Sequence, residues 1–209
     1  MEMNNLKNIS KKVESYNCKL LAVVKNQNIE DIKKLVEFGV NDLGENRLEE
    51  LSVHSENFPN QNFHFIAPLQ SRKISEILKH TKAIHSIFRK KELDIISKAY
   101  VGQELFVQVN IDGDINKSGL TPEQLFEFMY YAKEINIMPA GLMCIPNITS
   151  DRRVAFSKMQ NINEELKNNF QDYQGQLSMG MSDDYEIALE AGSNMIRIGS
   201  KIFGSRNYH

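Results

Sequence analysis

Short apolar runs and segments of helical periodicity alternate along the chain. Leu20 to Val24 is an unbroken apolar run, which is typical of a strand buried on both faces. In the next segment the apolar residues recur at helical spacing, with Asn28 in a capping position and Gly39 placed to end the helix. The same alternation predicts seven further strands, at residues 41–44, 62–66, 83–86, 105–109, 139–144, 176–180 and 195–198. An additional amphipathic helix is predicted over residues 3–17.

Eight strands in alternation with helices predict an α/β fold whose neighbouring strands run parallel and are joined by right-handed crossovers. Eight such units predict closure into a TIM-type (β/α)8 barrel, here with an extra N-terminal helix. A doubly wound open sheet is the alternative. Since the sequence shows no Pro/Gly/Ser-rich linker, internal repeat or low-complexity tract, we expect residues 1–209 to form a single barrel domain.

Composition narrows the class of protein. A chain of 209 residues with 41% hydrophobic residues can bury one substantial core, and a net charge of -2 gives no general reason to bind nucleic acid or an anionic membrane. Cys18 and Cys144 lie far apart without a CxxC motif, and no metal-ligand spacing is present, so we expect reduced thiols in a cytoplasmic protein without a metal site. Neither a leader-like N-terminus nor a membrane-length apolar run is seen, so membrane insertion is not expected.

Lys25 follows the first predicted strand directly. Desolvation at such a place disfavours the charged form, lowers the pKa of a lysine and leaves a nucleophilic amine that can form a Schiff base. The simpler interpretation is that the ammonium group reaches solvent at the end of the strand. Both interpretations stay open on this segment alone.

The last predicted strand ends in the glycine-rich turn Gly199 to Gly204, which can lead into a short helix. Exposed backbone N–H groups at such a turn suit an anion such as phosphate. Barrel closure would place this strand beside the first, so that Lys25 would face a cavity bordered by residues 197–200 and by Ser182. An aldehyde that carries a phosphate group would fit both ends of this cavity.

Seven motifs, in order along the chain, resemble those of the pyridoxal phosphate homeostasis protein family. They are Ala22-Val23-Val24-Lys25, Gly44-Glu45-Asn46-Arg47, His64-Phe65-Ile66 with Leu69-Gln70, Lys117-Ser118-Gly119, Gly141-Leu142-Met143, Leu177-Ser178-Met179-Gly180-Met181-Ser182-Asp183-Asp184, and Arg197-Ile198-Gly199-Ser200 with Ile202-Phe203-Gly204. One such tetrapeptide would mean little, whereas seven in the same order cover most of the chain.

The resemblance implies a fold type III pyridoxal phosphate protein, similar to the barrel domain of alanine racemase, in which Lys25 forms the internal aldimine with pyridoxal 5'-phosphate. It also implies a protein of vitamin B6 homeostasis, which buffers the cofactor or delivers it to pyridoxal-phosphate-dependent apoenzymes without an established catalytic turnover. We therefore assign no catalytic residue, and we expect a monomer.

The resemblance also assigns further residues to the cofactor. Gly199 and Ser200 would bind the phosphate, together with the hydroxyl of Ser182 or Ser178, and the spacing favours Ser182. Arg197 would face the pyridine nitrogen and keep it unprotonated, which makes the ring a poor electron sink.

Two side chains would line the cofactor ring, and a third residue is placed near it. Asn46 and His64 take the lining positions, and Lys117 would approach the phenolic oxygen side of the ring. Alanine racemase takes its second acid/base group from a β-rich domain that is not expected in this chain. One face of the cofactor should therefore stay open to solvent, which suits binding and transfer better than stereospecific proton transfer.

The sequence departs from the family pattern at three places near these motifs. Ala67-Pro68 stands where glycine is usual, Arg72 where asparagine is commoner, and Asn26-Gln27 where threonine or serine with lysine is usual. None of these removes an inferred cofactor contact, so they bear on the rim of the pocket and on a partner surface.

Two other classes of function are also compatible with these residues. An amino-acid racemase or a Schiff-base aldolase acting on a sugar phosphate is the enzyme alternative, and a scaffold whose cofactor binding modulates a partner is the third. Without the resemblance, His64 would be interpreted as a hydrogen-bonded core histidine. The other histidines show no ligand spacing and are expected at the surface or in loops, at positions 54, 80, 85 and 209.

Overall fold

The computed structural model describes residues 1–204, in which eight parallel strands form a closed barrel in sequence order, β1 to β8. The strands are β1 Lys19–Val23, β2 Asp42–Glu45, β3 Asn62–Phe65, β4 Ala83–Ile87, β5 Glu104–Val109, β6 Gly141–Cys144, β7 Gln176–Ser178 and β8 Met195–Ile198. Leu21 of β1 pairs with Asp42 of β2 on one side and with Arg197 of β8 on the other. This closure confirms the predicted barrel and excludes the open sheet.

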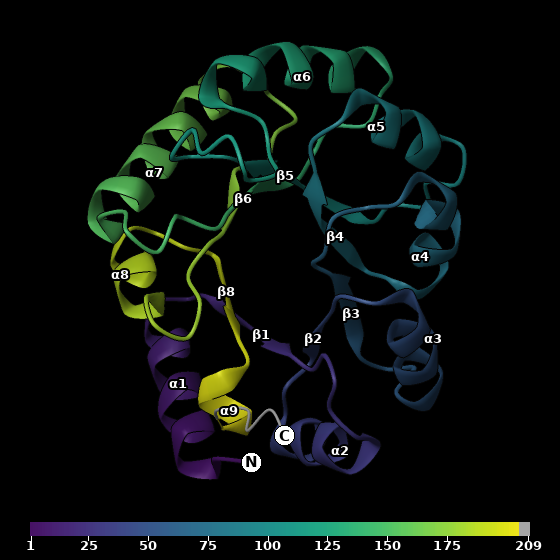
Figure 1. The fold of residues 1–209 in the computed structure, drawn as a ribbon, viewed down its shortest axis with the longest axis vertical. Helices are drawn as coiled ribbons and strands as arrows, with labels where there is room; N and C mark the ends of the chain where they lie inside the picture. The colour runs from purple at the N-terminus through teal and green to yellow at the C-terminus, as the bar shows by residue number, and fades with distance from the viewer. Residues whose placement is uncertain (205–209) are drawn as a thin grey trace.

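Helices surround the barrel as a ring (Figure 1). They are α1 Met3–Ser15, α2 Ile29–Phe38, α3 Leu48–Asn57, the 3-10 helix η1 Ser71–Lys73, α4 Ile74–His80, α5 Lys90–Ser97, α6 Pro122–Glu134, α7 Arg152–Asn169, α8 Tyr185–Glu190 and α9 Ser200–Phe203. Local chemistry fixes several ends: Asn28 accepts the Asp31 N–H at 2.8 Å at the start of α2, and Gly39 ends that helix with φ 101°.

The extra N-terminal helix packs beside the C-terminal end of the chain. Leu6, Ile9 and Val13 form the buried face of α1, as the periodicity predicts. The backbone N–H of Glu2 donates to the Ile202 carbonyl at 2.7 Å, so α1 and α9 lie together at the lower left of Figure 1. The first helix therefore holds the turn that follows β8.

The barrel interior is more polar than the sequence indicates. All five residues of β4 are buried, and His85 stacks on Phe106 with 4.3 Å between ring centroids. His54 is also buried, with its Nδ1 2.7 Å from Glu45 Oε1. The prediction that His54 and His85 lie at the surface is wrong, because both imidazoles have buried polar partners. His80 is partly buried, and His209 lies outside the described residues.

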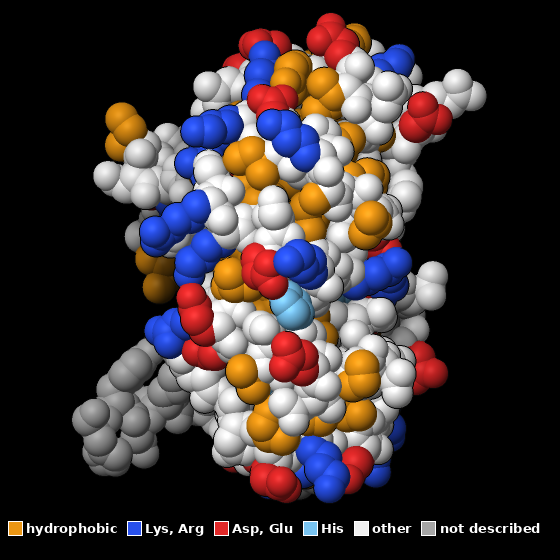
Figure 2. Space-filling model, turned by 90° about the vertical axis from the view of Figure 1, so that its right-hand side faces the viewer, with side chains coloured by type: hydrophobic (Ala, Val, Ile, Leu, Met, Phe, Trp, Pro, Cys, Tyr) orange, Lys and Arg blue, Asp and Glu red, His pale blue; other side chains and the backbone are white. Residues whose placement is uncertain are grey.

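The outer face over the helices at the right of Figure 1 mixes side chains of all kinds. Figure 2 shows positive, negative and apolar side chains interleaved over this face, without one large patch of a single kind. Within residues 1–204, none of the helices combines the length and the apolar character that a membrane crossing requires.

Candidate functional site

A cavity of about 690 Å³ opens at the carboxyl ends of the strands. Six of the eight residues that the sequence assigns to a cofactor line it: Lys25, Asn46, Ser182, Arg197, Gly199 and Ser200. Arg197 belongs to β8, and the other five lie in the segments that follow β1, β2, β7 and β8. Barrel closure is what brings the two ends of the chain to one cavity.

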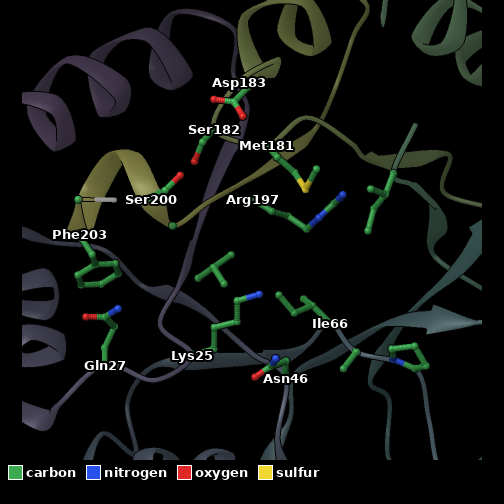
Figure 3. A pocket seen from close by; sticks show the side chains of 16 residues that line it. Lys25, Gln27, Asn46, Ile66, Met181, Ser182, Asp183, Arg197, Ser200 and Phe203 are labelled. Carbon is green, nitrogen blue, oxygen red and sulfur yellow. The ribbon is translucent and has the colours of Figure 1, made fainter. Parts of the chain in front are cut away.

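Lys25 lies in the turn that follows β1. The Val24 N–H donates to the Gly44 carbonyl at 3.0 Å, which extends the pairing with β2 up to the turn, and Asn26 takes a left-handed conformation with φ 57°. The Asn26 N–H donates to Glu50 Oε2 at 2.7 Å, which ties the turn to α3. Figure 3 shows the Lys25 side chain pointing into the cavity. Within residues 1–204 its amine forms no ion pair or hydrogen bond, so it is available to a ligand.

The opposite wall is formed where β8 passes into α9. A Cβ atom at Gly199 would lie 3.4 Å from both the Cβ and the carbonyl oxygen of Val23, which is ordinary van der Waals contact, so this turn packs directly against the end of β1. In the described chain, the N–H groups of Ser200 and Lys201 donate no backbone hydrogen bond, as expected for the first residues of a helix. The turn therefore presents free donors to an anion.

Ser182 approaches the same wall from the loop after β7, and Figure 3 shows it beside Ser200. This loop is fixed, because the Met181 N–H donates to Asp184 Oδ1 at 2.7 Å and Asp184 forms an ion pair with Arg152 at 2.8 Å. α8 begins only at Tyr185, so Ser182 lies in the loop between β7 and this helix. Its hydroxyl is free of hydrogen bonds to the described residues.

Arg197 is 5% exposed and forms the inner wall of the cavity. Its guanidinium donates to the Ser178 carbonyl at 2.6 Å, to Ser178 Oγ at 2.8 Å and to the Cys144 carbonyl at 2.9 Å. Burial lowers the pKa of Arg197, although an arginine stays protonated in proteins. An arginine has five N–H donors, so two remain for a ligand.

Asn46 supplies an unsatisfied polar atom. Its Oδ1 is buried and has no hydrogen-bond partner within residues 1–204. Such atoms are rare in folded proteins, and because Asn46 lines the cavity, a turn of its side chain toward a ligand donor would satisfy this oxygen. Beside it, the buried Glu45 accepts the Asn46 N–H at 3.2 Å, and burial raises the pKa of Glu45 against the opposing hydrogen bond from His54.

Three of the residues predicted near the cofactor do not line the cavity. Ser178 and His64 lie in the barrel interior, where Ser178 contacts Arg197 and His64 contacts His85 and Asp42. Lys117 reaches the Ile145 carbonyl at 3.2 Å on the rim.

Other lining residues were not identified as ligand contacts in the sequence. They are Val23, Gln27, Ile66, Ala67, Pro68, Ile145, Met181, Asp183, Phe203 and Gly204. Gln27, Ala67 and Pro68 stand at positions where the sequence departs from the family pattern. Those departures were the feature of the sequence that pointed to these three residues as part of the pocket rim.

The geometry suits a small ligand with an anionic end and a carbonyl group. An unpaired amine, a turn with free N–H donors, a buried cation and an unsatisfied amide oxygen share one cavity. Within residues 1–204, no group of three or more His, Cys, Asp or Glu side chains could hold a metal ion. The residues therefore fit a phosphorylated aldehyde cofactor.

Comparison with known proteins gives consistent relatives. The alanine racemase N-terminal domain family matches residues 3–207. The pyridoxal phosphate homeostasis protein of Pasteurella multocida is 36% identical over 206 residues, covering 91% of this chain and 87% of that protein. The protein of the same name from Aquifex aeolicus is 35% identical over 203 residues, with 92% and 89% covered.

A solved structure shows the same architecture over the whole chain. PipY of Synechococcus elongatus, solved without pyridoxal phosphate, has a TM-score of 0.89 and 25% sequence identity, and the match covers 98% of this chain and 100% of that one. The same protein solved with pyridoxal phosphate bound gives a TM-score of 0.86 at 23% identity, with the same coverage.

Proposed function

Because this chain belongs to the pyridoxal phosphate homeostasis proteins within the alanine racemase N-terminal domain family, we propose that it binds pyridoxal 5'-phosphate in the cavity described above. Its function is then to hold the cofactor reversibly and to buffer or deliver it. The observation that carries the proposal is that the unpaired Lys25 amine and the turn at Gly199 line the same cavity.

Each wall of the cavity has its own part in binding. When bound, pyridoxal phosphate supplies an aldehyde that an amine can attack, and Lys25 is the amine that lines the cavity without an ion-pair partner among the described residues. The N–H groups at Ser200 and the hydroxyls of Ser182 and Ser200 would hold the phosphate. Arg197 would face the ring nitrogen with its two remaining donors, and Asn46 would accept a hydrogen bond through its unsatisfied Oδ1.

Between the two candidate serines, we assign the phosphate to Ser182. Ser178 is fully buried and its hydroxyl oxygen accepts from Arg197, so it has no free route to the cavity. Ser182 lines the cavity beside Ser200 and its hydroxyl is free in the described chain. Ser178 and His64 then act on the cofactor only through Arg197 and the interior of the barrel.

We infer that the protein holds the cofactor without turning over a substrate. A permanently charged arginine at the ring nitrogen disfavours the electron-withdrawing form of the ring. A racemase also needs a second acid/base group opposite the lysine, and the remaining carboxylate among the described lining residues is Asp183. Figure 3 shows Asp183 beyond Ser182, on the far side of the cavity from Lys25.

The proposal extends to the setting in which the protein works. We propose one barrel domain that acts as a monomer in the cytoplasm and passes the cofactor to pyridoxal-phosphate-dependent apoenzymes. Cys18 and Cys144 support this setting, since both are unpaired thiols, the form that a reducing compartment maintains. Size-exclusion chromatography with light scattering tests the monomer, and transfer of cofactor to an added apoenzyme tests delivery.

The decisive experiment locates the cofactor on the chain. Purified protein is incubated with pyridoxal phosphate, reduced with borohydride and digested, and the expected result is a phosphopyridoxyl group on Lys25. Lys25→Ala should lose both the adduct and the near-visible absorbance. Lys7→Ala is the matched control, because Lys7 is an exposed lysine of α1 away from the cavity.

Three outcomes would contradict parts of the proposal. A colourless protein without adduct rejects cofactor binding, and an adduct that survives in Lys25→Ala rejects the assigned lysine. If the protein rapidly racemises a free amino acid and Asp183→Asn abolishes this activity, the protein is a racemase and not one that only holds and delivers the cofactor.

A further inference from the structure

A chain of hydrogen bonds crosses the barrel interior beneath the cavity. Arg197 donates to Ser178 Oγ at 2.8 Å, and Ser178 Oγ lies 2.9 Å from His85 Nδ1. His85 Nε2 lies 2.9 Å from His64 Nδ1, and His64 Nε2 lies 3.0 Å from Asp42 Oδ1. Five residues from β8, β7, β4, β3 and β2 are thus connected through their side chains.

The two ends of this chain face different surroundings. Arg197 lines the cavity at the carboxyl ends of the strands. Asp42 is the first residue of β2, and its side chain is 17% exposed near the opposite end of the barrel. His64, His85 and Ser178 between them are almost completely buried. The chain is therefore a polar path through an interior that otherwise holds Phe106 and other apolar side chains.

With both histidines neutral, one arrangement of protons satisfies every member of the chain. The Asp42 carboxylate can only accept, so His64 Nε2 carries a proton, and a neutral His64 then accepts at Nδ1. His85 must donate to it from Nε2, which leaves His85 Nδ1 to accept the hydroxyl proton of Ser178. The oxygen of Ser178 in turn accepts from Arg197, so every hydrogen bond points from Arg197 toward Asp42.

The electrostatics of the interior agree with this order. Burial, with the positive charge of Arg197 as a smaller cause, lowers the pKa of His85 well below 6.5, so His85 is neutral and has one N–H. Burial acts to raise the pKa of Asp42, but the hydrogen bonds from His64 and Asn62 outweigh it and lower that pKa. A neutral imidazole and an ionised carboxylate are what the one-way chain requires.

Arg197 depends on this order for its orientation. The carbonyls of Ser178 and Cys144 bind two of its N–H groups, and Ser178 Oγ binds a third. Because His85 takes the hydroxyl proton, the Ser178 oxygen keeps its lone pairs for the guanidinium. Without His85, the hydroxyl proton would lose its acceptor and compete for the carbonyls that hold Arg197.

We propose that His85 is a positioning residue for the cofactor site, which acts on Arg197 through Ser178 and is itself ordered by His64 and Asp42. This inference rests on the proposed function, since Arg197 faces the proposed cofactor in the cavity. His85 is not among the residues that line the cavity, so it would act on the cofactor only through Ser178 and Arg197.

The first test reads the protons directly and needs no cofactor. Nitrogen-15 NMR of the full chain reports which imidazole nitrogen of each buried histidine carries hydrogen. We expect hydrogen on Nε2 of His85 and of His64, and a bare Nδ1 on His85 whose signal shifts in Ser178→Ala. Hydrogen on His85 Nδ1 would overturn the one-way chain, whatever the protein binds.

The second test measures the cofactor. Ser178→Ala and His85→Leu should each shift the absorbance maximum of the bound cofactor and release it about tenfold faster, as loss of one hydrogen bond to a charged group predicts. The double variant should release it no faster than either single variant, because both changes break one chain. His85→Asn, whose amide oxygen can accept from Ser178, should lie between wild type and His85→Leu.

Ser193→Ala is the matched control for a buried serine. The Ser193 hydroxyl donates to the Met179 carbonyl at 2.7 Å, and within residues 1–204 it forms no hydrogen bond with Arg197. Its loss should lower stability and leave the spectrum and release rate unchanged. If both Ser178→Ala and His85→Leu release the cofactor at the wild-type rate and show the wild-type spectrum, the positioning role of His85 is rejected while the proposed function stands. A wild-type protein that binds no pyridoxal phosphate would reject this role and the proposed function together.

Discussion

Replacing Gly180 with alanine adds two separable costs at the loop that carries Ser182. Gly180 has φ 94°, a left-handed conformation that costs an ordinary residue about 1–2 kcal/mol. A new Cβ would also lie 2.5 Å from the Cβ of Ala188 and 3.1 Å from the Cα of Tyr185, so α8 would have to move. Overpacking of this kind costs roughly 1–3 kcal/mol, and the total is therefore about 2–5 kcal/mol.

Gly39 offers a matched comparison, because it has a similar positive φ without the contact. Its φ is 101° and nothing lies within 4 Å of a Cβ built there. Gly39→Ala should therefore cost only the strain, about 1–2 kcal/mol. The difference between the two variants isolates the packing of the loop on α8.

Urea unfolding followed by circular dichroism measures both free energies, with an unchanged m value as the condition for comparing them. We expect Gly180→Ala to lose more stability than Gly39→Ala and also to bind pyridoxal phosphate more weakly, because Ser182 follows two residues later. Equal losses of stability in the two variants would refute the packing argument. Unchanged cofactor affinity in Gly180→Ala would refute the link between this loop and the phosphate.

Three further outcomes follow from the buried polar groups. The pKa of His85 is lowered below 6.5 in the folded protein, so at lower pH the unfolded chain binds a proton that the folded chain does not. The free energy of unfolding should therefore fall by up to about 1.4 kcal/mol per pH unit as the pH drops below 6.5. His85→Leu should show a flatter dependence of this free energy on pH. Burial raises the pKa of Cys18 to about 11 and that of Cys144 to about 12. A thiol reagent at neutral pH should therefore modify these two cysteines only after the protein unfolds. Rapid reaction of the native protein would contradict this expectation. Asn46→Leu removes an unsatisfied buried oxygen, so the free energy of unfolding should stay within about 1 kcal/mol while cofactor affinity falls, and a large loss of stability would indicate a partner for that oxygen.

The alternation of apolar runs and helical segments was sufficient to predict the barrel and the meeting of Lys25 with the Gly199 turn. That meeting follows from the closure of β8 on β1, which strand number alone implies. The proposed assignment of the phosphate to Ser182 rests on structure, because it depends on where β7 ends. Ser178 is its last residue and points to Arg197, whereas Gly180 turns the chain before Ser182.

His85 could not be placed from its own segment. Ala83 to Ile87 is buried throughout, so no alternation of polar and apolar residues marks which side chains enter the barrel. The partners that make a buried imidazole stable come from β3 and β7, far away in sequence. His54 was missed for the same reason, since its partner Glu45 belongs to the preceding strand. Burial of a polar side chain is decided by its partners, and those are known only after folding.

The closure of β8 on β1 also sets an order of events on the ribosome. Lys25 and Ser200 are separated by 175 residues (200 minus 25), which at about 5–20 residues per second corresponds to roughly 10–35 seconds of translation. During that interval the nascent chain displays its amine while the groups for the phosphate have not yet been made. A stalled chain that ends before β8 should therefore retain no cofactor after washing, and loading should begin only after β8 and the turn that follows it have left the ribosome.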